Sequence, residues 1–160
     1  MSIQETLVIK LVLDTWNGQL SRADKFFAAH TDEQLLGEIA PGKNSGIYLL
    51  GHLTAVHDAL FPLFGIGEKC FPELENIFIK NPDKSGIEKP DVAHLRKCWK
   101  EVNEKLAQKL NAFSGDQWLQ KHTSVSEEDF KKEPHRNKLN VLLNRTNHLA
   151  YHLGQLALMG

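Results

Sequence analysis

The stretch VAHLRKCWKEVNEKLAQKLNAF, residues 92–113, decides the fold class of this chain. Its apolar residues recur at spacings of three and four, the period of an α-helix with one buried face. The stretch follows Pro90-Asp91 and stops at Ser114-Gly115, residue types that are typical of helix ends. The predicted buried stripe consists of Val92, Leu95, Trp99, Val102, Leu106, Leu110 and Phe113.

Three more segments carry the same period and are predicted to be helices. They run from about Ile3 to Ala29, from about Ser45 to Phe64, and from about Asn137 to the C-terminus. Asn17-Gly18 would indicate a hairpin turn between strands, but no alternating apolar residues flank it, so the first helix is predicted to continue. The expected buried residues are Leu7, Leu11, Leu20, Phe26 and Phe27 in the first helix and Leu49, Leu53, Val56, Leu60 and Leu63 in the second.

The connections before and after the 92–113 helix are long and contain most of the prolines. Loops of this length usually hold small elements of their own, and short helices are expected near residues 72–79 and 126–130. No stretch has the strict alternation of a β-strand. The chain is therefore predicted to be all-α, a four-helix bundle with long inter-helix connections, in a single domain spanning residues 1–160.

Composition excludes several classes of partner. The chain is 41% hydrophobic and 24% charged with a net charge of −1, and it lacks the clustered Lys and Arg of a nucleic-acid interface. It shows no signal-peptide pattern, and no apolar run approaches the roughly 18 residues needed to span a bilayer, so no membrane partner is expected. Cys70 and Cys98 lie far apart in no known motif, which favours reduced thiols and the cytoplasm.

The predicted chemistry starts from residues 147–155, which read NHLAYHLGQ. His148 and His152 are four residues apart and therefore face the same side of a helix. Two imidazoles so placed can share a metal ion at about 2.0–2.1 Å from each nitrogen. The pair lies in a helix that is predicted to be apolar around much of its circumference, where imidazoles without partners would be costly to bury.

A third histidine, His52, lies in the apolar stripe of the second helix. One inward histidine is more often a satisfied core residue than a ligand, but three on two helices are better explained by a shared ion. His57 points about 140° away from His52 and is excluded. Polar residues one turn from the ligands could orient them, or could be ordinary surface residues: Tyr48, Asn144 and Gln155.

These residues also carry a family resemblance. Gly51-His52-Leu53 and the run from His148 to Gln155 resemble the signature of the DinB/YfiT-like superfamily. The helix with Trp16, the segment 31–35 and the helix order fit it as well. The resemblance implies a four-helix bundle, often a homodimer, with one divalent metal, zinc or nickel, on three histidines. The matching positions are His52, His148 and His152.

Three neutral histidines leave a divalent ion at least one open position, as in catalytic rather than structural zinc sites. The leading hypothesis is a metal-dependent enzyme acting on a small molecule. The resemblance implies a transferase that uses a low-molecular-weight thiol, or a hydrolase. No Glu or Asp lies one turn from the histidines on the same face, and Asp58 points elsewhere, which favours thiol chemistry. The alternative is a non-catalytic metal- or small-molecule-binding stress-response bundle. A di-iron site is excluded because no Glu precedes either C-terminal histidine by three residues.

Overall fold

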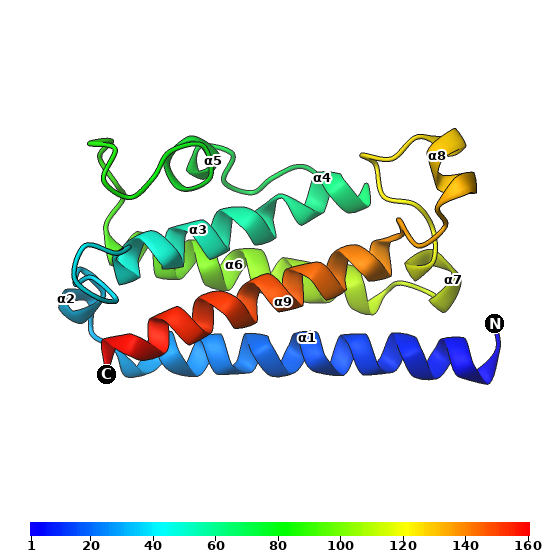
Figure 1. Cartoon of the computed structure of the whole chain (residues 1–160), viewed down its shortest axis with the longest axis horizontal. Coiled ribbons are helices and arrows are strands. Elements are labelled where there is room, and N and C mark those ends of the chain that lie inside the picture. Colours follow the sequence, from blue (N-terminus) through cyan, green and yellow to red (C-terminus); the bar gives the residue numbers. More distant parts are fainter.

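The computed structural model describes residues 1–160 and contains nine α-helices, one 3-10 helix and no β-strand. The predicted all-α class is confirmed. The four longest helices, α1 (Ile3–Ala29), α3 (Gly46–Asp58), α6 (Val92–Asn111) and α9 (Lys138–Leu156), lie side by side as a bundle (Figure 1). The short elements are α2 (Asp32–Leu35), α4 (Leu60–Phe64), α5 (Leu74–Phe78), α7 (Gly115–Trp118), α8 (Glu127–Lys132) and the 3-10 helix Ala157–Met159.

Helix α1 packs along α9, and α3 packs along α6, while α9 also contacts α3. Helices α3 and α9 run in opposite directions (Figure 1). The long connection between α4 and α6 carries α5, which packs on α3. The expected short helices near residues 72–79 and 126–130 correspond to α5 and α8.

The predicted core is confirmed in α3 and α6 and wrong in part of α1. Six of the seven residues predicted for the α6 stripe are buried, and Phe113, just beyond the helix, packs against the core. In α1, however, Leu7 and Leu11 are 54% and 57% exposed. Phe27 is buried as predicted, and the other buried residues of α1 recur every seven positions on the face opposite Leu7 and Leu11, at Ile9, Trp16 and Ala23.

The predicted second helix is broken at Ala59 into α3 and α4. Pro62 explains the break, because proline has no N–H to donate to the carbonyl of Asp58 and its ring clashes with that carbonyl. The buried Asp58 carboxylate instead accepts hydrogen bonds from the backbone N–H groups of Cys70 and Phe71, at 2.7 and 2.8 Å. This carboxylate therefore fixes the start of the long connection.

One segment, Gly46–Phe64, is long and apolar enough by composition to cross a membrane. This corrects the expectation that the chain has no such run. Within the fold, 78% of its apolar window is buried, so the segment, which comprises α3 and α4, belongs to the core of the bundle.

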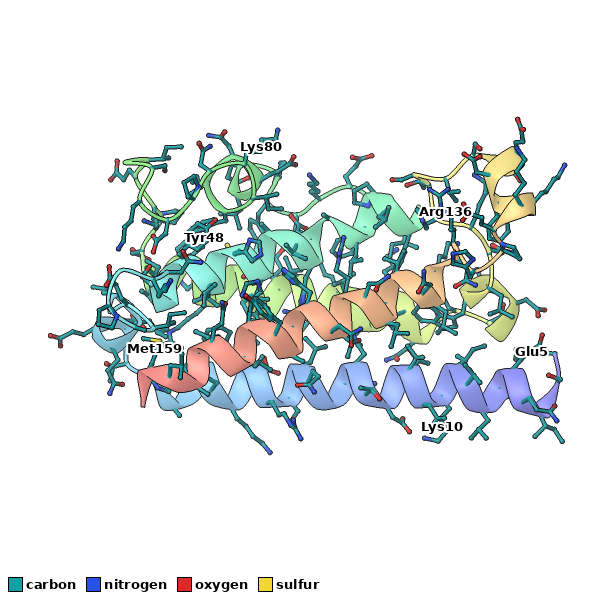
Figure 2. All side chains as sticks on the ribbon, viewed as in Figure 1. Glu5, Lys10, Tyr48, Lys80, Arg136 and Met159 are labelled. Carbon is teal, nitrogen blue, oxygen red and sulfur yellow. The ribbon has the colours of Figure 1, made fainter.

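Gly51 allows the connection to approach α3 closely. A Cβ atom at this position would lie 2.4 Å from the ring of Phe78. Because the glycine leaves that space, the Phe78 ring is fully buried against the helix. The hydroxyl of Tyr48, where α3 faces α5 (Figure 2), lies 2.8 Å from the carbonyl of Asn81 and 3.3 Å from that of Phe78, so it holds the connection to α3.

Candidate metal centre

His52 of α3 and His148 and His152 of α9 converge on one point. The Nε2 atom of His148 lies 3.1 Å from the Nε2 atoms of both His52 and His152. All three side chains are partly buried between the helices. Two nitrogens bound to one tetrahedral zinc ion at about 2.0–2.1 Å are about 3.3 Å apart, so the observed spacing fits a shared ion.

Hydrogen bonds at the far side of two rings determine which nitrogen carries the proton. The Nδ1 of His52 lies 2.7 Å from the Phe78 carbonyl, and the Nδ1 of His152 lies 2.7 Å from Oε1 of Gln155. Both oxygens are acceptors, so each Nδ1 carries the hydrogen and each Nε2 presents a lone pair. A neutral His148 has one proton and could satisfy at most one of these lone pairs, whereas a cation would satisfy all three nitrogens. The donor set therefore fits a divalent ion.

The surroundings keep the three rings neutral, which is the form that binds metal. Burial, followed by the neighbouring His152 and His52, lowers the pKa of His148 to about 3. Burial also lowers the pKa of the other two rings, against the opposing effect of their hydrogen bonds to Phe78 and Gln155.

The cluster contains three ligand groups and no carboxylate or thiol. A structural zinc site is usually closed by four protein ligands. Asp58, the acidic residue nearest in sequence to His52, is committed to the backbone of the long connection. A divalent ion held by this cluster would therefore have three imidazole ligands and no carboxylate among them.

The polar neighbours predicted for the site have different places in the structure. Gln155 contacts the Nδ1 of His152 as described, and the ring of Tyr48 faces that of His52 at 6.0 Å between centroids. Asn144 is exposed, and the Nδ1 of His148 has no hydrogen-bond partner. Sequence reasoning missed the Phe78 carbonyl, because a backbone acceptor in a loop leaves no signal in the side chains.

Gln155→Ala is expected to weaken metal binding by about 10- to 100-fold, the usual cost of losing a hydrogen bond that orients a ligand. The His152 ring would then lose the partner that fixes its orientation. Competition with a chelating dye measures the change. Asn144→Ala is the matched control on the same helix, and an equal loss of affinity in both variants would contradict the assignment.

His57 lies in the core and is not one of the three clustered histidines. It is fully buried between the rings of Trp16 and Trp99, with centroids at 4.9 and 5.1 Å. Its Nδ1 donates to Oδ1 of Asn103 at 2.9 Å, and its Nε2 has no partner. Burial lowers the pKa of His57 from 6.5 to about 4.

The metal-free protein is expected to lose stability as the pH falls from about 6.5 to about 4. Over that range His57 takes up a proton in the unfolded chain but not in the folded state, so acid favours unfolding. One such histidine contributes a slope of up to about 1.4 kcal/mol per pH unit. Urea unfolding at several pH values should show a shallower slope for His57→Gln than for wild type; equal slopes would contradict the buried neutral imidazole.

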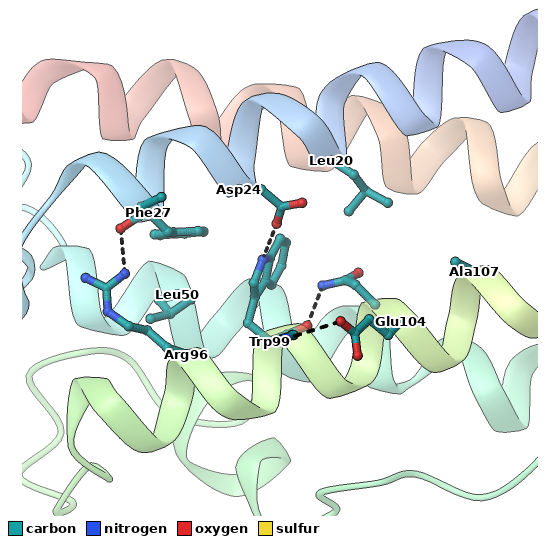
Figure 3. A pocket seen from close by; sticks show the side chains of 11 residues that line it. Leu20, Asp24, Phe27, Leu50, Arg96, Trp99, Glu104 and Ala107 are labelled. Atoms are coloured by element: carbon teal, nitrogen blue, oxygen red, sulfur yellow. Dashed lines mark hydrogen bonds and ion pairs between the residues drawn. The ribbon is translucent and has the colours of Figure 1, made fainter.

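A separate cavity of about 550 Å³ lies between α1 and α6, and none of the three ligand histidines lines it. Its wall includes the Trp99 indole, which donates to Asp24 at 2.8 Å, and Arg96, which donates to the Phe27 carbonyl (Figure 3). These polar groups already have hydrogen-bond partners within the protein, so they are less available to bind a ligand than the nitrogens of the histidine cluster.

Comparison with known proteins identifies a family that covers most of the chain. The family model described as the DinB superfamily matches residues 16–156, a range that includes all three histidines. A comparison with curated proteins found no match.

Proposed function

Because the chain belongs to the DinB superfamily and its three imidazoles converge without a fourth protein ligand, we propose that it is a metal-dependent enzyme. The ion is divalent, zinc or nickel, and the reaction transfers a low-molecular-weight thiol to a small molecule. The observation that carries the proposal is the close approach of three imidazole nitrogens, which all lie within 4.8 Å of one another, with Nε2 of His148 3.1 Å from the Nε2 atoms of the other two.

The residues around the site favour a thiol over water as the nucleophile. A divalent ion held here would supply Lewis-acid chemistry by lowering the pKa of a thiol or water that joins it. Hydrolysis usually also needs a positioned base, and the cluster contains no carboxylate. The neutral imidazoles leave the positive charge of the ion undiminished, which stabilises a thiolate without a base.

Cobalt substitution tests the proposal, since nitrogen-rich zinc sites also accept cobalt. Protein without a His tag is loaded with Co(II) and titrated with 2-mercaptoethanol. We expect one equivalent of cobalt and a new near-ultraviolet band from sulfur coordination. We also expect faster attack of the thiol on an alkyl halide, with halide released as the S–C bond forms.

Two results would redirect the proposal. Metal-dependent hydrolysis of p-nitrophenyl acetate without a sulfur band would identify a hydrolase. Tight metal binding with no response to thiol and no hydrolysis would favour a non-catalytic metal-binding bundle. Zinc-loaded wild type and the His148→Ala variant serve as references for both assays.

We also propose a cytoplasmic homodimer. The exposed face of α1 supports the dimer, because Ile3, Leu7, Val8 and Leu11 are 52% to 85% exposed and neighbouring apolar side chains are typical of interfaces. Light scattering should give twice the monomer mass for wild type and the monomer mass for Leu7→Glu/Leu11→Glu. A monomeric wild type at micromolar concentration would reject the dimer.

A further inference from the structure

Arg145 is the cation nearest in sequence to the histidine cluster and has no anionic partner. It lies on α9 three residues before His148 and seven before His152, so all three side chains share one face of the helix. The side chain is partly buried, its Nε is buried without a hydrogen bond, and no carboxylate lies within ion-pair distance of it.

The charge of Arg145 acts on both the metal centre and the core. It contributes to lowering the pKa of His52, His148 and His57. Helices α9 and α3 are antiparallel (Figure 1). Arg145 lies one turn before His148 on α9, and the start of α9 lies beside the end of α3, the half that carries His57. Arg145 is therefore placed toward that half of α3.

Two other arginines of the chain have partners. Arg96 pairs with Asp32 and donates to backbone carbonyls, and Arg136 pairs with Glu133. Arg22 is exposed on α1 and needs none. Arg145 is thus unusual in being partly desolvated yet unpaired, a condition that costs free energy unless a ligand supplies the anion.

The other unsatisfied buried nitrogens belong to the same neighbourhood. The buried side-chain atoms without a hydrogen bond are Nε of Arg145, Nδ1 of His148 and Nε2 of His57. When Nε2 of His148 faces an ion, its Nδ1 carries the hydrogen, so Arg145 and His148 each offer a donor. Two donors beside a cationic centre that lacks any carboxylate match an acidic ligand group.

We propose that Arg145 binds a carboxylate of the small molecule that acts at the metal centre, so that the site selects thiols bearing an acidic group. This inference rests on the proposed thiol-transfer function. A guanidinium pairs with a planar carboxylate through two parallel hydrogen bonds. Arg145 is accordingly a specificity-determining residue that acts on the substrate rather than on the ion.

The test compares two thiols of equal length, 3-mercaptopropionate and 3-mercaptopropanol, on Co(II)-loaded protein. Wild type should bind the carboxylate thiol about 10- to 100-fold more tightly, the range expected for hydrogen bonds to a charged group. Arg145→Met should abolish this preference, and Arg145→Lys should retain part of it. Arg22→Met is the matched control and should behave as wild type.

Several outcomes would overturn the inference. Equal affinity of wild type for the two thiols would remove the carboxylate site. A preference that persists in Arg145→Met would place the carboxylate on the ion itself. Loss of cobalt from Arg145→Met would show that Arg145 has a structural role. The inference would then stand only if Arg145→Lys binds cobalt and keeps part of the preference for the carboxylate thiol.

A second measurement does not depend on thiol binding. In nitrogen-15 NMR spectra of the metal-free protein, the Arg145 Nε–H signal, assigned by its absence in Arg145→Lys, should shift on titration with acetate. If neither thiol binds cobalt but acetate shifts this signal, the thiol function fails and the carboxylate site stands. If acetate leaves the signal unchanged, the carboxylate site fails even where thiols bind.

Discussion

His148→Ala will leave the protein without stoichiometric metal. The Nε2 atom of His148 lies 3.1 Å from the Nε2 atoms of both His52 and His152, so His148 is the histidine that is close to both of the others. Without it two neutral imidazoles remain, and no carboxylate or thiol in the cluster can substitute. The loss should exceed the roughly 10- to 100-fold effect of removing an orienting hydrogen bond. Elemental analysis of protein purified without a His tag should fall from about one equivalent to none.

His135→Ala is the matched control, because His135 is exposed and lies outside the cluster. It should keep one equivalent of metal. Circular dichroism should show that His148→Ala remains folded, since His148 is only partly buried. Tight metal binding by His148→Ala would show that the ligands are different residues. A wild type that binds no zinc or nickel after reconstitution would make the three histidines core residues.

The sequence predicts that the three histidines lie together, but it does not predict all of the hydrogen-bond acceptors that orient their rings. The spacing of His148 and His152 places them on one helix face, and the apolar stripe around His52 directs that residue inward. The Phe78 carbonyl that orients His52 was not predicted, because its position depends on how a long connection packs against Gly51. Tertiary packing of backbone groups leaves little trace in residue type.

The helices, too, were predicted correctly in some places and wrongly in others. The strong apolar period of α6 gave both its bounds and its buried face, whereas α1 carries apolar residues around much of its surface and the wrong face was chosen at Leu7 and Leu11. The one-turn helices α2 and α7 were missed. Each opens with a capping box, Thr31 with Gln34 and Ser114 with Gln117, which is a signal readable from sequence.

Gly51→Ala is expected to destabilise the protein although alanine is the better helix former. The exchange gains about 1 kcal/mol in helix propensity. The new methyl group, however, would lie 2.4 Å from the buried Phe78 ring, and overpacking of this kind typically costs about 1–3 kcal/mol. Displacing Phe78 also moves the carbonyl that orients His52, so metal affinity should fall together with the unfolding free energy.

Gly18→Ala provides the matched control, because Gly18 lies in the interior of α1 with no atom near its missing Cβ. It should stabilise the protein by about 0.5–1 kcal/mol and leave metal affinity unchanged. Phe78→Leu in the Gly51→Ala background relieves the clash, so the two substitutions should be strongly non-additive in a double-mutant cycle. Additive effects would mean that Gly51 and Phe78 are not in contact, and a Gly51→Ala variant more stable than wild type would remove the reason for glycine beside His52. If Gly51→Ala lowers both the free energy of unfolding and the metal affinity, Gly51 helps to shape the metal site. If it lowers only the free energy of unfolding, Gly51 serves core packing alone.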